Sequence, residues 1–369
     1  MKVSRFRECF LLADDLFFLC PLSANPSMNY RSIAHLSNDV RSWSASLPAD
    51  LDLVVGVPRS GMLPANMVAL CRNLPFTDLQ GLLEGRLLSS GPRGVGGITE
   101  EDLKRGRCTI LILDDCVSSG KAMRRVHEQV APLRGQHDLL MGAVYGDPRA
   151  NVELDLLCDA LHMPYLFEWN IMHSWGVQNG CLNMDGVLCR DPDPHQDDDG
   201  PAYRQFLENA DPYLLPTKKV AHIITCRLEK YRAETEQWLA DHGVKYEQLT
   251  MMTYPDVATR DADRRYGAYK AEVYRSKKSY RLFIESSLHQ AHQIAQWSGK
   301  PVFCTETMEM LVPGTHPFQS VDSSPHDYHV GVFNGRVKRA ARKATGYLRA
   351  TAHEAKVGAY RLAKQLVEP

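Results

Sequence analysis

The stretch that decides the fold of the first half of the chain is ILILDDCVSSGKAMRRV, residues 110–126. Its apolar run predicts a buried β-strand that ends in the paired acids Asp114 and Asp115. A small, hydroxyl-rich turn follows, and a helix is predicted to begin near Lys121. Free backbone N–H groups and the helix dipole make such a turn an anion site, and paired acids can accept hydrogen bonds from vicinal sugar hydroxyls. The pattern therefore favours binding of a sugar phosphate, and the GxxxxGK[ST] spacing of a Walker loop is absent.

Similar short apolar runs recur along the chain, with helical patterns between them. The predicted strands are 51–57, 108–115, 139–146, 219–225, 280–286 and 300–304. Runs continuous in Val, Ile and Leu predict strands that are covered on both faces. Alternation of strands and helices predicts an α/β fold with parallel sheets.

Turn-rich stretches indicate how the chain is divided. A length of 369 residues is enough for two or three domains. Gly176, Asn179 and Gly180 cluster near residues 170–180, where we expect a linker. The predicted division is a first domain over 1–178, a second over 179–312 and a helical tail over 313–369.

The tail is basic, although the formal net charge of the whole chain is -1. Residues 331–369 carry nine Lys or Arg against two Glu. We expect a helix over 336–366 that makes peripheral contact with an anionic membrane surface. A solvated helix packed on the body explains the pattern equally well, and we do not expect nucleic acid as a partner.

Cysteine usage and the N-terminal residues predict the cellular compartment of the protein. The ten cysteines are scattered without a CxxC pair, which favours a reducing compartment. Asp14 and Asp15 interrupt the apolar N-terminal run, so it does not fit a signal peptide. We therefore expect a cytoplasmic protein, with the inner membrane surface as its site of peripheral contact.

Two segments carry a resemblance to type I phosphoribosyltransferases over roughly residues 30–150. LILDDCVSSGKAM resembles the motif that binds 5-phosphoribosyl-1-pyrophosphate (PRPP), and VVGVPRSGMLPA (54–65) resembles the pyrophosphate loop of the same family. A DD pair alone fits an ordinary strand end, but two loops in the family's order favour the resemblance. The PRPP-binding residues that it implies are Arg59, Ser60, Gly61, Asp114, Asp115, Ser118, Ser119, Gly120 and Lys121.

The resemblance also implies a role for each part of this set. The two acids hold the ribose 2- and 3-hydroxyls, the turn that follows them surrounds the 5-phosphate, and the upstream loop holds pyrophosphate with Mg²⁺. GRLLSSGPRG (85–94) stands where the family has a lid, so Arg86 or Arg93 is expected to reach pyrophosphate. Some family members bind PRPP only as regulators.

The second half resembles haloacid-dehalogenase-like (HAD) phosphatases over about 180–305. GCLNMDGVLCRD (180–191) is similar to their first motif, DxDGxL at a strand end. Thr225 at a predicted strand end, Lys270 and Glu285 fit the second, third and fourth motifs in order. The predicted fold class is therefore α/β with two Rossmann-like parallel-sheet domains, a phosphoribosyltransferase fold and then a HAD fold, followed by the basic helical tail.

The chemistry of such phosphatases explains the residues. A carboxylate attacks phosphorus and forms an aspartyl phosphate. By the resemblance Asp185 is the acid/base, and Thr225 and Lys270 hold the phosphoryl oxygens. Asn183, Asp185 and Glu285 would be the ligands of Mg²⁺. The catalytic residues predicted for the whole chain are Asp114, Asp115, Asn183, Asp185, Thr225 and Lys270.

This sequence departs from the family pattern at the nucleophile, where Asn183 stands in place of Asp. An amide is a poor nucleophile and a weak, neutral ligand for Mg²⁺. One interpretation is a naturally inactive domain kept for binding. The other is an Asp→Asn change made to trap a substrate complex, and the otherwise intact motif set favours it.

The order of the two domains indicates a function. A 5-phosphoribosyl transfer leaves a phosphate on the product, and a phosphatase would remove it. The arrangement is similar to bifunctional ribofuranosyltransferases of bacterial surface-polysaccharide assembly, which implies a glycan or lipid-linked glycan acceptor. The alternatives are a nucleobase phosphoribosyltransferase whose nucleotide is dephosphorylated to a nucleoside-like metabolite, and a PRPP-sensing regulator.

An aromatic segment, WNIMHSW (169–175), follows the first predicted domain. We expect Trp169 and Trp175 to pack in a core, with an acceptor pocket as the alternative, and His173 receives no role.

Overall fold

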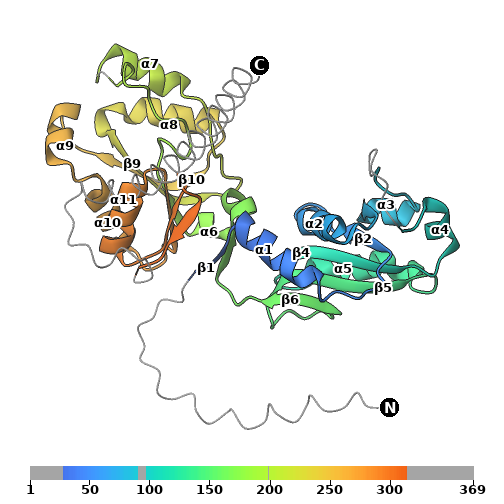
Figure 1. Cartoon of the computed structure of the whole chain (residues 1–369). Helices are drawn as coiled ribbons and strands as arrows, with labels where there is room; N and C mark the ends of the chain where they lie inside the picture. Colours follow the sequence, from blue (N-terminus) through green and yellow to red (C-terminus); the bar gives the residue numbers. More distant parts are fainter. Residues whose placement is uncertain (1–27, 90–96, 198, 314–369) are drawn as a thin grey trace, which may run out of the picture.

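Figure 1 shows the computed structural model, which describes residues 28–89, 97–197 and 199–313. Two mainly parallel β-sheets, each accompanied by helices, occupy successive parts of the chain. The predicted α/β fold class is confirmed. The predicted basic tail and Arg93 of the predicted lid lie outside the described residues.

The first sheet has five parallel strands in the order β3-β2-β4-β5-β6. Its strands are β2 (Leu53–Gly56), β3 (Phe76–Asp78), β4 (Thr109–Val117), β5 (Asp138–Gly146) and β6 (Leu156–Ala160). The helices of this part are α1 (Ile33–Ser44), α2 (Met62–Arg72), α3 (Leu79–Glu84), α4 (Glu100–Arg105), α5 (Lys121–Val130) and the 3₁₀ turn η1 (Ala131–Leu133).

Strand β4 is apolar on both faces, as its continuous Ile and Leu run predicts. Ile110 and Ile112 pack into one hydrophobic cluster, while Leu111 and Leu113 pack into another. All four side chains are fully buried. Alternate residues of a strand point to opposite faces, so the two clusters cover the two faces of the sheet.

The second sheet has six strands in the order β10-β9-β8-β11-β12-β13, and only β13 is antiparallel to its neighbour. Its strands are β8 (Gly180–Leu182), β9 (Val220–Leu228), β10 (Tyr246–Met252), β11 (Leu282–Glu285), β12 (Val302–Cys304) and β13 (Glu309–Leu311). The helices are α7 (Pro201–Asn209), η3 (Glu229–Tyr231), α8 (Arg232–Asp241), α9 (Val257–Asp263), α10 (Tyr266–Ser276) and α11 (Leu288–Ser298). The division at residue 178 stays a prediction, and each sheet is built from strands on one side of it.

Several helices begin at capping residues that the sequence supplies. The side chains of Ser32, Asp78, Thr99, Asp256 and Ser287 each accept a hydrogen bond from the backbone N–H three residues later. Each cap satisfies one of the N–H groups that a helix start leaves without a partner. No helix within the described ranges is long and apolar enough to cross a membrane.

The segment between the two sheets, where a linker is predicted near residues 170–180, is packed against the rest of the chain. β1 (Asn29–Arg31) pairs in parallel with β7 (Tyr165–Phe167). The 3₁₀ helix η2 (Glu168–His173) and helix α6 (Trp175–Gln178) follow directly. Ile171, Met172 and Val177 are buried in the hydrophobic cluster of the second sheet. Their apolar side chains stabilise this segment more than its glycines loosen it.

Candidate active sites

The two acids of the first site lie inside β4, so the prediction that the strand ends at them is wrong. On one side β4 pairs with β5 as far as Val117, which extends the strand beyond the acids. On the other side β2 ends at Gly56, opposite Leu113. Asp114 and Asp115 therefore lie just past the end of β2, at the carboxyl-end edge where α/β sheets commonly bind ligands.

The structure brings the upstream loop and the acidic pair together. The Ser60 hydroxyl donates to Asp115 Oδ1 at 2.8 Å. Asp114 Oδ1 accepts the backbone N–H of Asp115 at 2.9 Å. A Cβ atom on Gly61 would lie 2.8 Å from Asp114 Oδ1 and 2.6 Å from the backbone oxygen of Val57, so only glycine fits there. The close approach of this loop to the two acids thus explains why residue 60 is a serine and residue 61 is a glycine.

The turn before α5 is open to solvent. Ser118, Ser119 and Lys121 are exposed, and the N-cap residue Gly120 provides no side-chain cap. Arg59 of the upstream loop is also exposed. Exposed hydroxyls, cations and uncapped N–H groups at a helix start are the donors that a phosphate group needs. Of the predicted lid, Arg86 forms a surface ion pair with Glu84 at 3.3 Å.

Burial changes the acidity of this pair. Asp114 and Asp115 are 7% and 5% exposed. Burial, and next the negative charge of Asp115, raise the pKa of Asp114 to about 8. Near neutral pH Asp114 therefore keeps its proton.

This raised pKa predicts a pH-dependent stability. In the folded chain Asp114 keeps its proton up to about pH 8, whereas unfolding returns its pKa to the ordinary range near 3.8. Its contribution to the free energy of unfolding should therefore fall as pH rises from about 4 to 8. We expect Asp114→Asn to match the unchanged protein at pH 4 and to be more stable at pH 9. Urea denaturation at both pH values checks this, and equal stability at pH 9 would contradict it.

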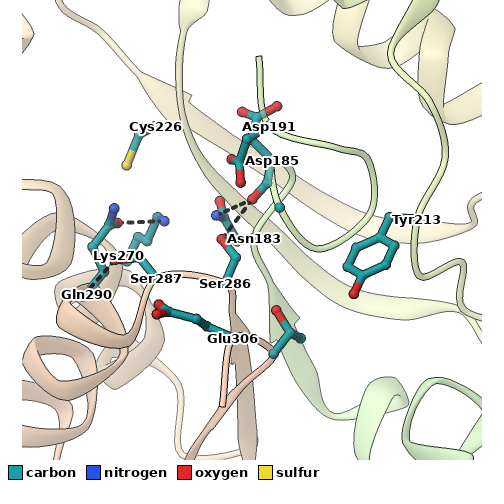
Figure 2. Close-up of a pocket in the computed structure, with 12 residues that line it drawn as sticks. Asn183, Asp185, Asp191, Tyr213, Cys226, Lys270, Ser286, Ser287, Gln290 and Glu306 are labelled. Atoms are coloured by element: carbon teal, nitrogen blue, oxygen red, sulfur yellow. Dashed lines mark hydrogen bonds between the residues drawn. The ribbon is translucent and has the colours of Figure 1, made fainter. Parts of the chain in front are cut away.

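The second site lies where β8 ends, in a cavity of about 490 Å³ (Figure 2). Its lining residues are Asn183, Asp185, Gly186, Asp191, Tyr213, Cys226, Lys270, Ser286, Ser287, Gln290, Thr305 and Glu306. Gly186 has a φ of +73°, and a Cβ atom there would lie 2.4 Å from the Ser286 hydroxyl and 2.7 Å from Asp191 Oδ2. The glycine of the DG pair thus permits both the turn and the approach of these side chains.

The Asn183 amide occupies the centre of this site. Its Nδ2 donates to the backbone oxygen of Asp185 at 2.8 Å and to Glu285 Oε1 at 3.1 Å. Two oxygens that converge on one atom would suit a small cation, but the amide group already satisfies both. No group of three or more His, Cys, Asp or Glu side chains is placed to hold a metal ion in the described part of the chain. With Asn at position 183 the set does not fit Mg²⁺, because Glu285 supplies one anionic oxygen, the backbone oxygen of Asp185 is neutral, and a second anionic oxygen is missing.

A buried ion pair adjoins Asn183. Lys270 Nζ donates to Glu285 Oε2 at 2.7 Å, with both side chains at most 1% exposed. Lys270 also donates to Gln290 Oε1 at 2.9 Å, which Figure 2 shows at the edge of the cavity. The structure thus brings three predicted residues, Asn183, Lys270 and Glu285, into one hydrogen-bonded group.

The Asp185 carboxylate is held by Arg227, a residue that the sequence analysis missed. Arg227 Nε donates to the two carboxylate oxygens at 3.0 and 3.1 Å. The Arg227 side chain is fully buried, and that of Asp185 is 20% exposed. A buried Arg needs an anionic partner. Arg227 directly follows an apolar run, in TCR (225–227), and this placement is the sequence feature that could have identified it as a buried partner of an acid.

Thr225 lies inside β9 and not at a strand end, which corrects the prediction. β9 continues to Leu228 because it pairs with β10, whereas its other neighbour β8 ends at Leu182, opposite Ile223. Thr225 is fully buried, and its hydroxyl accepts the backbone N–H of Arg227 at 3.2 Å. The cavity is lined at this point by Cys226.

The comparisons with known solved structures each cover a part of the chain. No family model and no curated protein matches the chain. Among solved structures, a purine phosphoribosyltransferase from Pyrococcus horikoshii is 17% identical, with 38% of this chain and 93% of that chain covered and a TM-score of 0.29. The Helicobacter pylori xanthine-guanine-hypoxanthine phosphoribosyltransferase is 14% identical, with 39% and 93% covered and a TM-score of 0.29. A Neisseria gonorrhoeae hypothetical protein with bound ppGpp is 10% identical, with 39% and 90% covered and a TM-score of 0.30.

The described residues thus define an α/β protein with two mainly parallel sheets and a candidate site at each. Solved structures similar to a part of the chain include phosphoribosyltransferases.

Proposed function

We propose that the chain transfers a 5-phosphoribosyl group from PRPP to an acceptor hydroxyl, and that its second half is built to remove the 5-phosphate afterwards. The observation that carries this proposal is the buried pair Asp114 and Asp115, which adjoins both the Ser60 loop and the uncapped start of α5. A sugar that carries phosphate at one end and pyrophosphate at the other needs acceptors for its hydroxyls between two anion sites. The domain division at residue 178 is part of this proposal.

In the first step the acceptor oxygen attacks C1 of the ribose. The bond from C1 to pyrophosphate breaks, pyrophosphate leaves with the electron pair, and the acceptor hydroxyl proton passes to solvent. Positive charge develops on the ring at C1, and the negative charge of the acidic pair stabilises it. Arg59 and the backbone around Gly61 hold the leaving group, while Ser118 and Lys121 hold the 5-phosphate. Mg²⁺ would enter with the pyrophosphate as part of the substrate.

In the second step a carboxylate at position 183 would attack phosphorus, the bond from phosphorus to the ribose 5-oxygen would break with a proton supplied by Asp185, and water would then hydrolyse the aspartyl phosphate. Asn183 lacks the anionic oxygen that this attack requires, so the protein with Asn at position 183 should release little phosphate. With Asp at this position, Mg²⁺ would be held by that carboxylate, the Asp185 backbone oxygen and Glu285, and would offset negative charge. Lys270 offsets charge at the phosphoryl oxygens. Asp185 is proposed as the acid/base, and its contact with Arg227 must open for it to donate a proton.

The acceptor that we propose is a hydroxyl of a bacterial glycan, carried on a lipid. A chain with one site that binds PRPP and another that removes phosphate fits a product that is released without its 5-phosphate. The basic residues of 336–366 would bring the chain to an anionic membrane surface where such an acceptor lies. A nucleobase acceptor would produce a nucleoside-like metabolite by the same two steps, and only the acceptor separates the two functions.

An acceptor assay tests the proposal. PRPP and Mg²⁺ are incubated separately with a saccharide acceptor, with purine and pyrimidine bases, and with no acceptor. We expect PRPP consumption with the saccharide, and an adduct whose mass exceeds that of the acceptor by one phosphoribosyl group. Consumption with bases alone would favour the nucleoside function. PRPP binding without consumption in any mixture would favour the regulator.

A further inference from the structure

The carboxylate of Asp115 is fixed by a residue far away in the sequence. Its Oδ1 accepts from Ser60 at 2.8 Å, and its Oδ2 accepts from the indole Nε1 of Trp169 at 2.7 Å. Each oxygen therefore accepts from a protein donor, and the carboxyl group of Asp114 shares a further side-chain hydrogen bond with Asp115, so these contacts together set the carboxylate plane. The remaining lone pairs are available to hydroxyl donors of a ligand.

The indole of Trp169 is itself held in place by a stack of aromatic rings. Its ring lies 4.7 Å from that of Phe167, at an interplanar angle of 16°. Phe167 stacks in turn on Tyr145 at 5.4 Å and 23°. Tyr145 is fully buried and donates its hydroxyl to Asp39 at 2.7 Å. A planar side chain within such a stack has little rotational freedom, so its N–H group keeps one direction.

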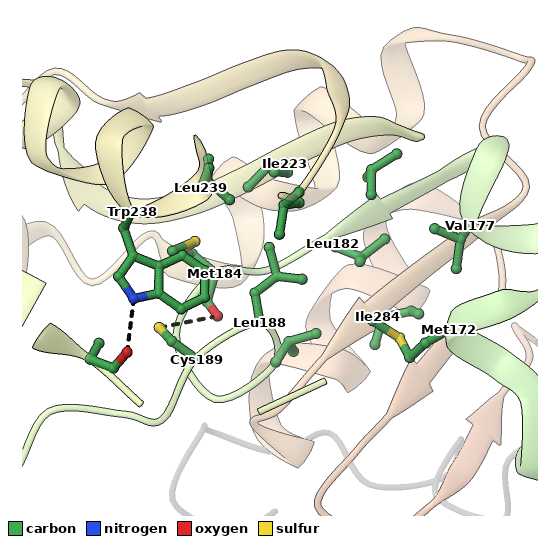
Figure 3. Close-up of a cluster of buried hydrophobic side chains, with 14 of the residues drawn as sticks. Met172, Val177, Leu182, Met184, Leu188, Cys189, Ile223, Trp238, Leu239 and Ile284 are labelled. Carbon is green, nitrogen blue, oxygen red and sulfur yellow. Dashed lines mark hydrogen bonds between the residues drawn. The ribbon is translucent and has the colours of Figure 1, made fainter. Parts of the chain in front are cut away.

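The segment that carries Trp169 is fixed on its other side by the second sheet. Met172 and Val177 lie against Leu182 and Ile284, as Figure 3 shows, and all four belong to one hydrophobic cluster. Ile171, two residues after Trp169, is buried in the same cluster. The donor to Asp115 thus comes from a stretch that the second half of the chain holds in position.

We propose that Trp169 is a positioning residue for the candidate PRPP site, which directs the Asp115 carboxylate toward the ribose hydroxyls. This inference rests on the proposed function. Trp169 acts through Asp115, so its loss should weaken recognition of the sugar and leave recognition of pyrophosphate to Arg59, Ser60 and Gly61. The segment after β7 thereby makes the first site depend on the packing of the second sheet.

The test compares Trp169→Phe with Trp175→Phe. The first change keeps a ring for the stack but removes the N–H donor. The second removes an indole N–H that is buried without a hydrogen-bond partner among the described residues, which makes it a matched control. Titration calorimetry measures the binding of PRPP and of pyrophosphate, each with Mg²⁺. We expect Trp169→Phe to weaken PRPP binding about 10- to 100-fold, the typical effect of one hydrogen bond to a charged group. Pyrophosphate binding should be unchanged, and Trp175→Phe should bind both ligands like the unchanged protein.

A double-mutant cycle with Asp115→Ala, which removes the acceptor of the Trp169 N–H group, completes the test. Because Trp169 acts through Asp115, adding Trp169→Phe to Asp115→Ala should cause little further loss of PRPP affinity. Unchanged PRPP affinity in Trp169→Phe, an equal loss of pyrophosphate affinity, or additive losses in the cycle would each overturn the inference. If the unchanged protein binds pyrophosphate but not PRPP, the proposed function fails and this inference fails with it.

Discussion

Replacing Asn183 with Asp should raise phosphate release from a 5-phosphoribosyl adduct by on the order of 10⁴-fold or more, since loss of a covalent nucleophile typically costs that much. The amide nitrogen now donates to the Asp185 backbone oxygen and to Glu285. A carboxylate there would supply both the attacking oxygen and a second anionic ligand of a cation, beside Glu285. The measurement is phosphate release from the isolated adduct, with and without Mg²⁺.

The same change should make folding depend on the cation. Without Mg²⁺, the new carboxylate would face Glu285 and lose both hydrogen bonds, so the thermal midpoint should fall. Added Mg²⁺ should restore it, by linkage between binding and folding. Asn179→Asp makes the same chemical change at an exposed position and should alter neither property. Phosphate release by the unchanged protein that equals the release by Asn183→Asp would place the nucleophile elsewhere.

Replacing Asp114 and Asp115 together by Asn should reduce PRPP turnover by roughly 10³-fold, because the negative charge of the pair, which stabilises the positive charge at C1, is lost. The fold should survive. An Asn at 115 can accept from Trp169 through its oxygen and donate to Ser60 through its nitrogen. An Asn at 114 resembles the protonated acid that burial already favours. The measurement is pyrophosphate release at saturating acceptor, with thermal unfolding as the check on folding.

Asp138→Asn serves as the matched control, since this acid is exposed at the start of β5. Full transferase activity in the double variant would remove the role proposed for the acidic pair. The double variant should keep its phosphatase behaviour unchanged, because position 183 and its contacts are not altered.

The interior strands could be predicted because a continuous apolar run indicates a strand that is buried on both faces. The runs at 108–115, 139–146 and 219–225 each correspond to a central strand, β4, β5 and β9. Short or polar strands were missed, such as β10 (Tyr246–Met252), where four of the first five residues are polar or half-exposed aromatic. Edge strands bury one face at most, so their sequences carry a weaker signal.

The ends of the central strands could not be predicted, because a strand continues as long as a neighbour pairs with it. β5 extends β4 past Asp114 and Asp115, and β10 extends β9 past Thr225. The chemistry-bearing residues nevertheless lie at the sheet edge, since β2 and β8 on the other side end earlier.

The sequence by itself determined the α/β class, the apolar runs of the interior strands and the candidate positions of Asn183 and the acidic pair. Only the tertiary structure decided which side chains form hydrogen bonds with these residues. The contacts of Trp169 with Asp115 and of Arg227 with Asp185 join residues 54 and 42 positions apart. The physical reason is that burial and periodicity are local properties of a sequence, whereas a hydrogen bond between distant side chains depends on how strands and loops pack in space.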